Sequence, residues 1–205
     1  SSVVLPNLMS FCGSAASQPH QEELVFQPSI ISDTRTFSTW PFRESYVIII
    51  EKGGALMRSL AHAIVRSLES GQALELVTVL TASGSTPRGP GAMLAVFLDG
   101  TAVGTVGGGN VEFEATAVAK SLLQSQQDAL REFRLIQGDA ASLGMVCGGD
   151  LTLHFQYLSA DDASTLALFR ELLEATGQNR DVWLVRRLDN EKVSAMDLAD
   201  RDGPR

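Results

Sequence analysis

The sequence predicts an α/β fold in which a mixed β-sheet is flanked by helices. Apolar, β-branched segments typical of strands alternate with segments in which apolar residues recur at helical spacing. Glycines cluster where strand patterns stop or begin, which indicates sharp bends at the strand ends. The chain has 205 residues, of which 44% are hydrophobic and 20% charged, so it is long enough for one ordinary globular domain.

The first predicted helix covers residues 55–69, and the first predicted strand of the sheet covers residues 74–81. In the helical segment, apolar residues occupy every fourth position: Leu56, Leu60, Ile64 and Leu68. His62 falls on the opposite, polar face, which indicates a solvent-exposed side chain. Residues 74–81 are apolar with little alternation, a pattern typical of a strand covered on both faces. We therefore expect this strand at the centre of the sheet.

Residues 92–98 and 101–106 form two further predicted strands, which flank the dipeptide Asp99-Gly100. This dipeptide is a strong signal for a hairpin with a type I′ turn. An antiparallel hairpin brings the segment before its first strand and the segment after its second strand to one end of the sheet. Both of those segments are rich in glycine.

A second helix is predicted after the triple glycine 107–109, with Asn110 as its N-cap. Its apolar face comprises Val111, Ala115, Val118 and Leu122. The remaining predicted elements are strands over residues 131–136, 151–157 and 181–188 and a helix over residues 161–176. His154 alternates with apolar neighbours inside its strand, so we expect it on the opposite strand face from them.

Composition excludes several function classes. The net charge of −8 and the pI near 4.8 argue against non-specific binding to nucleic acid or to an anionic membrane surface. No apolar run is long enough to span a bilayer. The two cysteines, Cys12 and Cys147, are far apart and form no disulfide framework, which favours a reducing, cytoplasmic setting. Residues 1–53 lack sustained periodicity and are expected to be a disordered or artefactual tail, followed by a domain over 54–205.

Three segments combine glycine with groups suited to ligand binding: residues 83–93, 104–112 and 143–149. In the first, proline and glycine hold hydroxyl groups and Arg88 in a stiff loop. In the second, backbone amides precede a helix and are able to bind an anion. In the third, the Cys147 thiol could serve as a nucleophile, a sulfur carrier or a soft metal ligand. The alternative is that all three are tight turns and that Cys147 is a small buried hydrophobe.

Taken together, the three motifs resemble the N-terminal domain of the XdhC/CoxI family, the accessory factors of xanthine dehydrogenases and related molybdenum hydroxylases. The motifs are Gly-Ser-Thr-Pro-Arg at 84–88 with Gly-Ala-Met at 91–93, Gly-Thr-Val-Gly-Gly-Gly at 104–109 with Glu112, and Leu-Gly-Met-Val-Cys-Gly-Gly at 143–149. Their order and spacing match over about residues 57–160. Family members usually carry a Rossmann-like C-terminal domain, which is expected to be absent here because the chain ends before one could begin.

The resemblance implies a chaperone that transiently binds the molybdenum cofactor, assists its sulfuration with a cysteine desulfurase, and inserts it into an apo molybdenum hydroxylase. It also implies frequent self-association. The implied cofactor-binding residues are Ser85, Thr86, Arg88, Gly107, Gly108, Gly109, Glu112, Cys147, Gly148 and Gly149. Cys147 is the implied metal ligand. Some members carry cysteine directly after the triple glycine, where this chain has Asn110.

Two other functions compete with the chaperone. The first is a cysteine-dependent or nucleotide-binding enzyme that uses Cys147 and the glycine loops. It needs a positioned base, and the histidines after residue 53 lie on a helix surface and inside a strand. The second is a non-catalytic interaction domain in which the glycines only make turns. A bound pterin would separate the cofactor carrier from both.

Overall fold

The computed structural model describes residues 46–48, 55–135, 149–178, 180, 182–189 and 192–200. Their helices are α1 (Ala55–Glu69), α2 (Gly109–Ser125) and α3 (Ala163–Gly177). Their strands are β1 (Tyr46–Ile48), β2 (Leu74–Gly84), β3 (Met93–Phe97), β4 (Ala102–Gly104), β5 (Ala129–Leu135), β6 (Gly149–Leu158), β7 (Val182–Asp189) and β8 (Lys192–Asp200). Within this part of the chain, no helix has the length and apolarity needed to cross a membrane.

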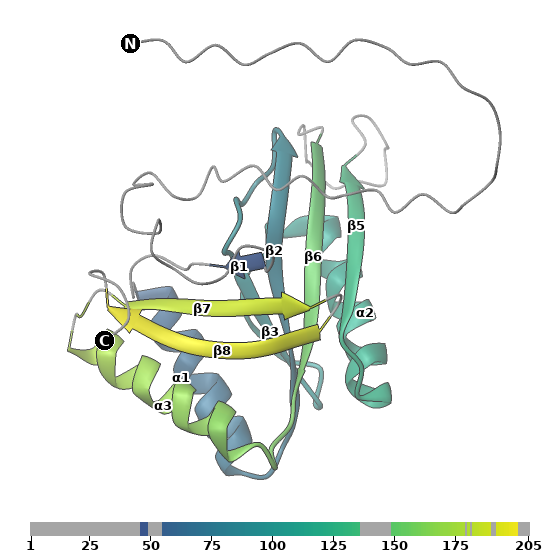
Figure 1. The fold of residues 1–205 in the computed structure, drawn as a ribbon. Coiled ribbons are helices and arrows are strands. Elements are labelled where there is room, and N and C mark those ends of the chain that lie inside the picture. Colours follow the sequence, from purple (N-terminus) through teal and green to yellow (C-terminus); the bar gives the residue numbers. More distant parts are fainter. Residues whose placement is uncertain are drawn as a thin grey trace, which may run out of the picture.

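The strands form two sheets (Figure 1). The larger has the order β4-β3-β2-β6-β5, so β2 is its central strand, as predicted. The smaller has the order β1-β7-β8, and its strand β1 lies inside the range 1–53 that the sequence set apart from the fold. The α/β class with flanking helices is confirmed. A mixed sheet was expected, but every strand pair among the described residues is antiparallel.

The connections explain why the larger sheet contains no parallel neighbours in its described strands. Adjacent parallel strands need a crossover connection between them, usually a helix. Here α2 joins β4 to β5, and these are the two edge strands of the sheet. The central pairs are instead β2 with β3 and β2 with β6, and both are antiparallel.

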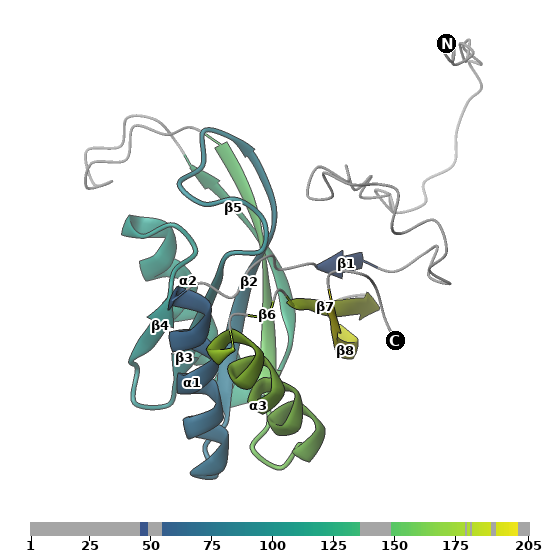
Figure 2. The same cartoon turned by 90° about the vertical axis from the view of Figure 1, so that its left-hand side faces the viewer.

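Each face of the larger sheet has its own hydrophobic core. On one face, Leu74 and Leu76 of β2 pack with residues of α1, α3 and β7. On the other, Val77 and Val79 pack with the buried side of α2. Figure 2 shows α2 and the β7–β8 ribbon on opposite sides of this sheet. The non-alternating apolar pattern of β2 thus reports two covered faces, as the sequence predicted.

Four local predictions need correction. Leu56 was expected to face the core but is 52% exposed at the first turn of α1. The β3–β4 turn is not type I′, because a positive φ occurs at Gly100 but not at Asp99. The Gly100 amide donates to the Phe97 carbonyl, and the Phe97 amide donates to the Thr101 carbonyl. These bonds define a three-residue loop with glycine in the left-handed position. The N-cap of α2 is Gly108, not Asn110, and β2 continues to Gly84.

Candidate functional site

The first two glycine segments meet at one end of the larger sheet, as the hairpin predicted. At Gly107, a side chain would place its Cβ 2.7 Å from Cγ of Pro87. The same residue has a φ of 142°. A residue other than glycine would therefore be both strained and in collision with the first loop. Close contact between the two loops requires glycine at this position.

The last residue of the third segment lies beside the first segment. Gly149 pairs with Gly84 at the end of the β2–β6 ladder. An added Cβ at Gly149 would lie 2.2 Å from the Ser83 carbonyl oxygen and 3.0 Å from Cγ2 of Thr86. Gly149 is thus required by close backbone approach, and it brings the start of β6 against the first loop.

Several predicted site residues lie together in this corner: Ser85, Thr86, Arg88, Gly107, Gly108, Gly109, Glu112 and Gly149. Cys147 and Gly148 lie outside the described residues, so the position of the thiol stays a prediction. Among the residues that the structure does describe, no group of three or more histidine, cysteine, aspartate and glutamate side chains is arranged to hold a metal.

Glu112 organises the triple-glycine corner from within. Its Oε2 accepts hydrogen bonds from the Thr105 hydroxyl at 2.5 Å, from the Gly108 amide at 3.0 Å and from the Val106 amide at 3.3 Å. The Gly107 amide donates to Oγ1 of Thr105 at 3.1 Å. The amides of Gly107 and Gly108, which the sequence assigned to a ligand anion, therefore already have acceptors inside the protein. Sequence reasoning missed this arrangement because the usual signal, a capping box, has its carboxylate three residues after the N-cap, whereas Glu112 follows Gly108 by four.

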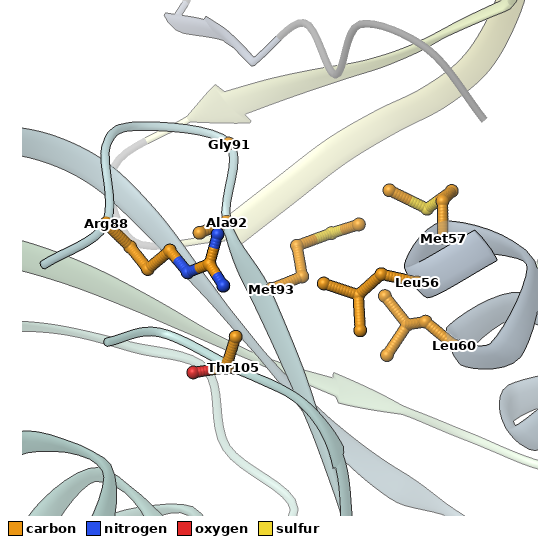
Figure 3. A pocket seen from close by; sticks show the side chains of 8 residues that line it. All are labelled: Leu56, Met57, Leu60, Arg88, Gly91, Ala92, Met93 and Thr105. Carbon is orange, nitrogen blue, oxygen red and sulfur yellow. The ribbon is translucent and has the colours of Figure 1, made fainter. Parts of the chain in front are cut away.

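Arg88 stands at the edge of a cavity of about 190 Å³ between α1 and the first loop (Figure 3). The cavity is lined by Leu56, Met57, Leu60, Arg88, Gly91, Ala92, Met93 and Thr105. Arg88 is exposed and makes no hydrogen bond or ion pair with the described part of the chain. Figure 3 shows its guanidinium reaching over the same space into which Met57 and Met93 point. The corner thus combines an apolar wall with a cation that has no partner in the described part of the chain.

A second polar cluster, which the sequence did not indicate, is sealed inside the protein. Arg186 of β7 is 0% exposed and donates to Oγ1 of Thr78 at 2.5 Å and to Oε1 of Gln156. Its Nη2 lies 3.1 Å from Nδ1 of His154. Because guanidinium only donates, that nitrogen of His154 must be an unprotonated acceptor. The cluster joins β7 to the larger sheet and is closed to substrate, so it is structural.

Glu75 is a buried carboxyl on the central strand. It is 0% exposed, and neither of its oxygens has a hydrogen-bond partner in the described part of the chain. Burial, reinforced by the charge of Asp128, raises its pKa to about 9. The side chain is therefore a neutral acid at pH 7. Its side chain is on the opposite strand face from those of Leu74 and Leu76. Glu75 is the second residue of β2, whereas the loop corner follows the last residue of this strand.

Comparison with known proteins finds a family likeness over part of the chain. Residues 67–134 match the XdhC and CoxI family. The matched segment begins in the last turn of α1 and continues through β2, β3, β4, α2 and nearly all of β5. It contains the first two glycine loops and Glu112. The resemblance inferred from the three motifs is thus confirmed over these residues.

Two curated relatives from Escherichia coli (strain K12) share 35% identity with the chain. One is the molybdenum cofactor insertion chaperone PaoD, matched over 97 residues, which is 47% of this chain and 30% of PaoD. The other is the uncharacterised protein YqeB, matched over 78 residues, which is 38% of this chain and 14% of YqeB. The chain therefore spans less than a third of the length of these relatives.

A solved structure shows the same fold. The crystal structure described as a xanthine dehydrogenase from Bacillus halodurans superposes with a TM-score of 0.55 at 22% identity. The match covers 67% of this chain and 41% of that structure. At this level of identity, the likeness establishes the arrangement of helices and strands and nothing about ligands.

Proposed function

We propose that this chain is a chaperone domain that binds the molybdenum cofactor in the loop corner and delivers it to an apo molybdenum hydroxylase. The observation that carries the proposal is the convergence of the glycine segments, in which Pro87 touches Gly107 and Thr86 touches Gly149. The similarity to PaoD, whose name states cofactor insertion, supplies the chemical identity of the ligand.

The chemistry of the corner fits such a ligand. The cofactor has a phosphate, a flat pterin and a dithiolene-bound metal, and in the client enzyme it supplies the redox centre. Arg88 is a cation that no described residue pairs with, and it is suited to the phosphate. The apolar wall beside it suits a ring. Cys147 is the residue we assign to the metal end, because thiolates favour soft metals.

The proposal includes two further steps: the chain binds the cofactor transiently, and a cysteine desulfurase helps to sulfurate the cofactor while it is bound. A carrier must release its ligand, so we expect retention that survives purification but yields to the apo-hydroxylase. Self-association of the chain also remains a prediction, to be tested by light scattering.

A cysteine-dependent enzyme is less well supported. Nucleophilic activation of a thiol needs a nearby base. His62 is exposed on α1, and His154 is buried in the Arg186 cluster. Neither histidine of the described residues is placed in the loop corner.

Co-expression with the cofactor biosynthesis enzymes tests the proposal. The purified chain should contain pterin, detected by fluorescence after acid oxidation, together with molybdenum. Cys147→Ser should lower the molybdenum content, whereas Cys12→Ser, the matched control, should leave it unchanged. Equal molybdenum in both variants and the parent would remove Cys147 from the site.

A further inference from the structure

The cavity beside Arg88 is too small for a whole cofactor. Its volume is about 190 Å³, whereas pockets that enclose a complete drug-sized ligand measure roughly 300–1,000 Å³. It has room for one ring system or one side chain. Its lining residues come from the first two turns of α1, from the loop before β3, and from Met93 and Thr105 at the base of the β3–β4 hairpin, so the cavity adjoins the loop corner directly.

The walls of the cavity favour a flat, electron-delocalised group. Met57 and Met93 present thioethers to the space, and thioethers make favourable contacts with aromatic rings. The guanidinium of Arg88 is planar and able to stack on a ring or to bind a phosphate with two parallel hydrogen bonds. Thr105 closes the cavity below Arg88.

Charge decides where an anionic ligand places its phosphate. The triple-glycine corner, which the sequence offered as an anion site, already holds the Glu112 carboxylate against Val106 and Gly108. A phosphate brought there would meet a like charge, and the amides of Val106, Gly107 and Gly108 already have acceptors. Arg88 carries the opposite charge and has no partner among the described residues. In a chain of net charge −8, a cation in this position favours an anion.

We propose that this cavity, lined by Met57, Met93 and Thr105, takes the fused heterocyclic ring of the cofactor, and that Arg88, rather than the triple glycine, binds its phosphate. The proposal rests on the function proposed above and deepens it, because it assigns the organic end of the ligand to a defined pocket. An apolar side chain of a partner protein would also fit the volume. Such a side chain would leave Arg88 without an anion, whereas a ring with an attached phosphate would fill the cavity and also pair with Arg88.

The test uses the full chain co-expressed with the cofactor biosynthesis enzymes and measures pterin per mole of chain. Two variants alter the pocket. Arg88→Gln removes the cation, and Met57→Glu places a carboxylate beside it in the first turn of α1, where the helix dipole tolerates acid. Arg88→Gln loses a charge-assisted interaction with the phosphate, and Met57→Glu repels the phosphate and competes for Arg88. Each change should lower retained pterin by about tenfold.

Matched controls make the same chemical changes elsewhere. Leu98→Glu adds a carboxylate at an exposed apolar residue, 59% accessible, at the far tip of the β3–β4 hairpin. Arg131→Gln removes an exposed cation from β5, the opposite edge strand from β4. Both should retain parental pterin. Circular dichroism and the unfolding midpoint verify the folded state of each variant, and Arg88→Gln carries the test if Met57→Glu misfolds.

The outcomes separate this inference from the proposed function. Loss of pterin in the pocket variants with retention in the controls supports it. If the parent and all variants retain equal pterin, the pocket assignment is overturned while the chaperone function stands. If the pocket variants keep pterin but no longer activate an apo-hydroxylase, the pocket serves a protein partner and the assignment is again overturned. A parent without pterin overturns both.

Discussion

The two arginines that matter most in this protein occupy opposite environments. Arg186 is fully buried, with the neutral groups of Thr78, His154 and Gln156 as partners, and burial lowers its pKa to about 10. It therefore remains charged at neutral pH. Arg88 is exposed and has no partner in the described part of the chain. The interior cation is committed to holding β7 on the sheet, whereas the surface cation is available to a ligand.

Two glutamates also differ in their surroundings, but here the buried side chain lacks hydrogen-bond partners and the one at the loop corner has them. Glu75 is buried without hydrogen-bond partners and has a pKa raised to about 9. Glu112 sits at the loop corner and accepts from Thr105, Val106 and Gly108. A carboxyl group with partners shapes the site, while one without them costs stability in the core. Substitutions in the two regions should therefore differ in sign and in size.

The largest effect is expected from Arg186→Ala. The change deletes a buried side chain and leaves the Gln156 oxygen and the His154 nitrogen without their donor, so we expect the free energy of unfolding to fall by about 3–5 kcal/mol. Urea unfolding followed by circular dichroism measures this loss. A loss below about 1 kcal/mol, the size of an exposed-residue effect, would show that the cluster does not hold β7 in place.

Glu75→Leu should act in the opposite direction. Removing an unpartnered buried carboxyl should raise the free energy of unfolding by about 1–3 kcal/mol at pH 5, and by more at higher pH, where the folded parent keeps a proton that the unfolded chain releases. The folded-state pKa is about 9 and the ordinary value is 4.5, so the folded protein binds the extra proton between these limits. Parental stability should therefore decline as pH rises from about 5 to 9, by up to ~1.4 kcal/mol per pH unit, and the decline due to Glu75 should level off above the folded pKa.

The comparison of pH profiles sharpens this prediction. Thermal or urea unfolding between pH 5 and pH 9 should show a decline in the parent that is absent from Glu75→Leu. Asp162, whose pKa is lowered by hydrogen bonds from Ser164 and Thr165, titrates below this window and does not contribute to it. Parallel profiles for parent and variant would mean that Glu75 is not the group responsible.

Glu112→Gln should have a smaller effect on stability, about 1 kcal/mol. The amide can still accept from one donor, but the charge that strengthens the bonds from the Gly108 amide and the Thr105 hydroxyl is lost. Amide hydrogen exchange at Val106 and Gly108 should accelerate in the variant. Unchanged protection at both amides would show that the carboxylate does not organise the corner.

Arg88→Gln should leave stability unchanged within about 0.5 kcal/mol, the usual range for an exposed residue without partners. This is the sharpest form of the comparison, because Arg186→Ala and Arg88→Gln each alter one cation of the same chain. A pronounced drop in the unfolding midpoint for Arg88→Gln would reveal that the residue has a structural partner after all.

Local patterns predicted the elements well because the relevant forces act over a few residues. The periodicity of residues 55–69 indicated α1 to its terminal residues, and the apolar run at 74–81 indicated a central strand. The hairpin followed from Asp99-Gly100, although its turn type was wrong. Turn type depends on whether the loop has two or three residues, and here Leu98 belongs to the loop.

Features that depend on distant contacts were not predictable in the same way. The continuation of β2 to Gly84 results from pairing with Gly149, a partner 65 positions further along the chain. Leu56 was misplaced because the helical pattern cannot show that the core ends before the first turn of α1. The local sequence gives no signal for the burial of Arg186, which results from the packing of β7 on β6.

The central claim is that the loop corner carries the molybdenum cofactor, with Arg88 as its anion-binding residue. The most direct measurement is the pterin content of the purified chain and of Arg88→Gln after co-expression with the cofactor biosynthesis enzymes, with Arg131→Gln as control. The account predicts pterin in the parent and in the control and about tenfold less in Arg88→Gln. Pterin-free parental protein, or equal pterin in all three, would contradict it.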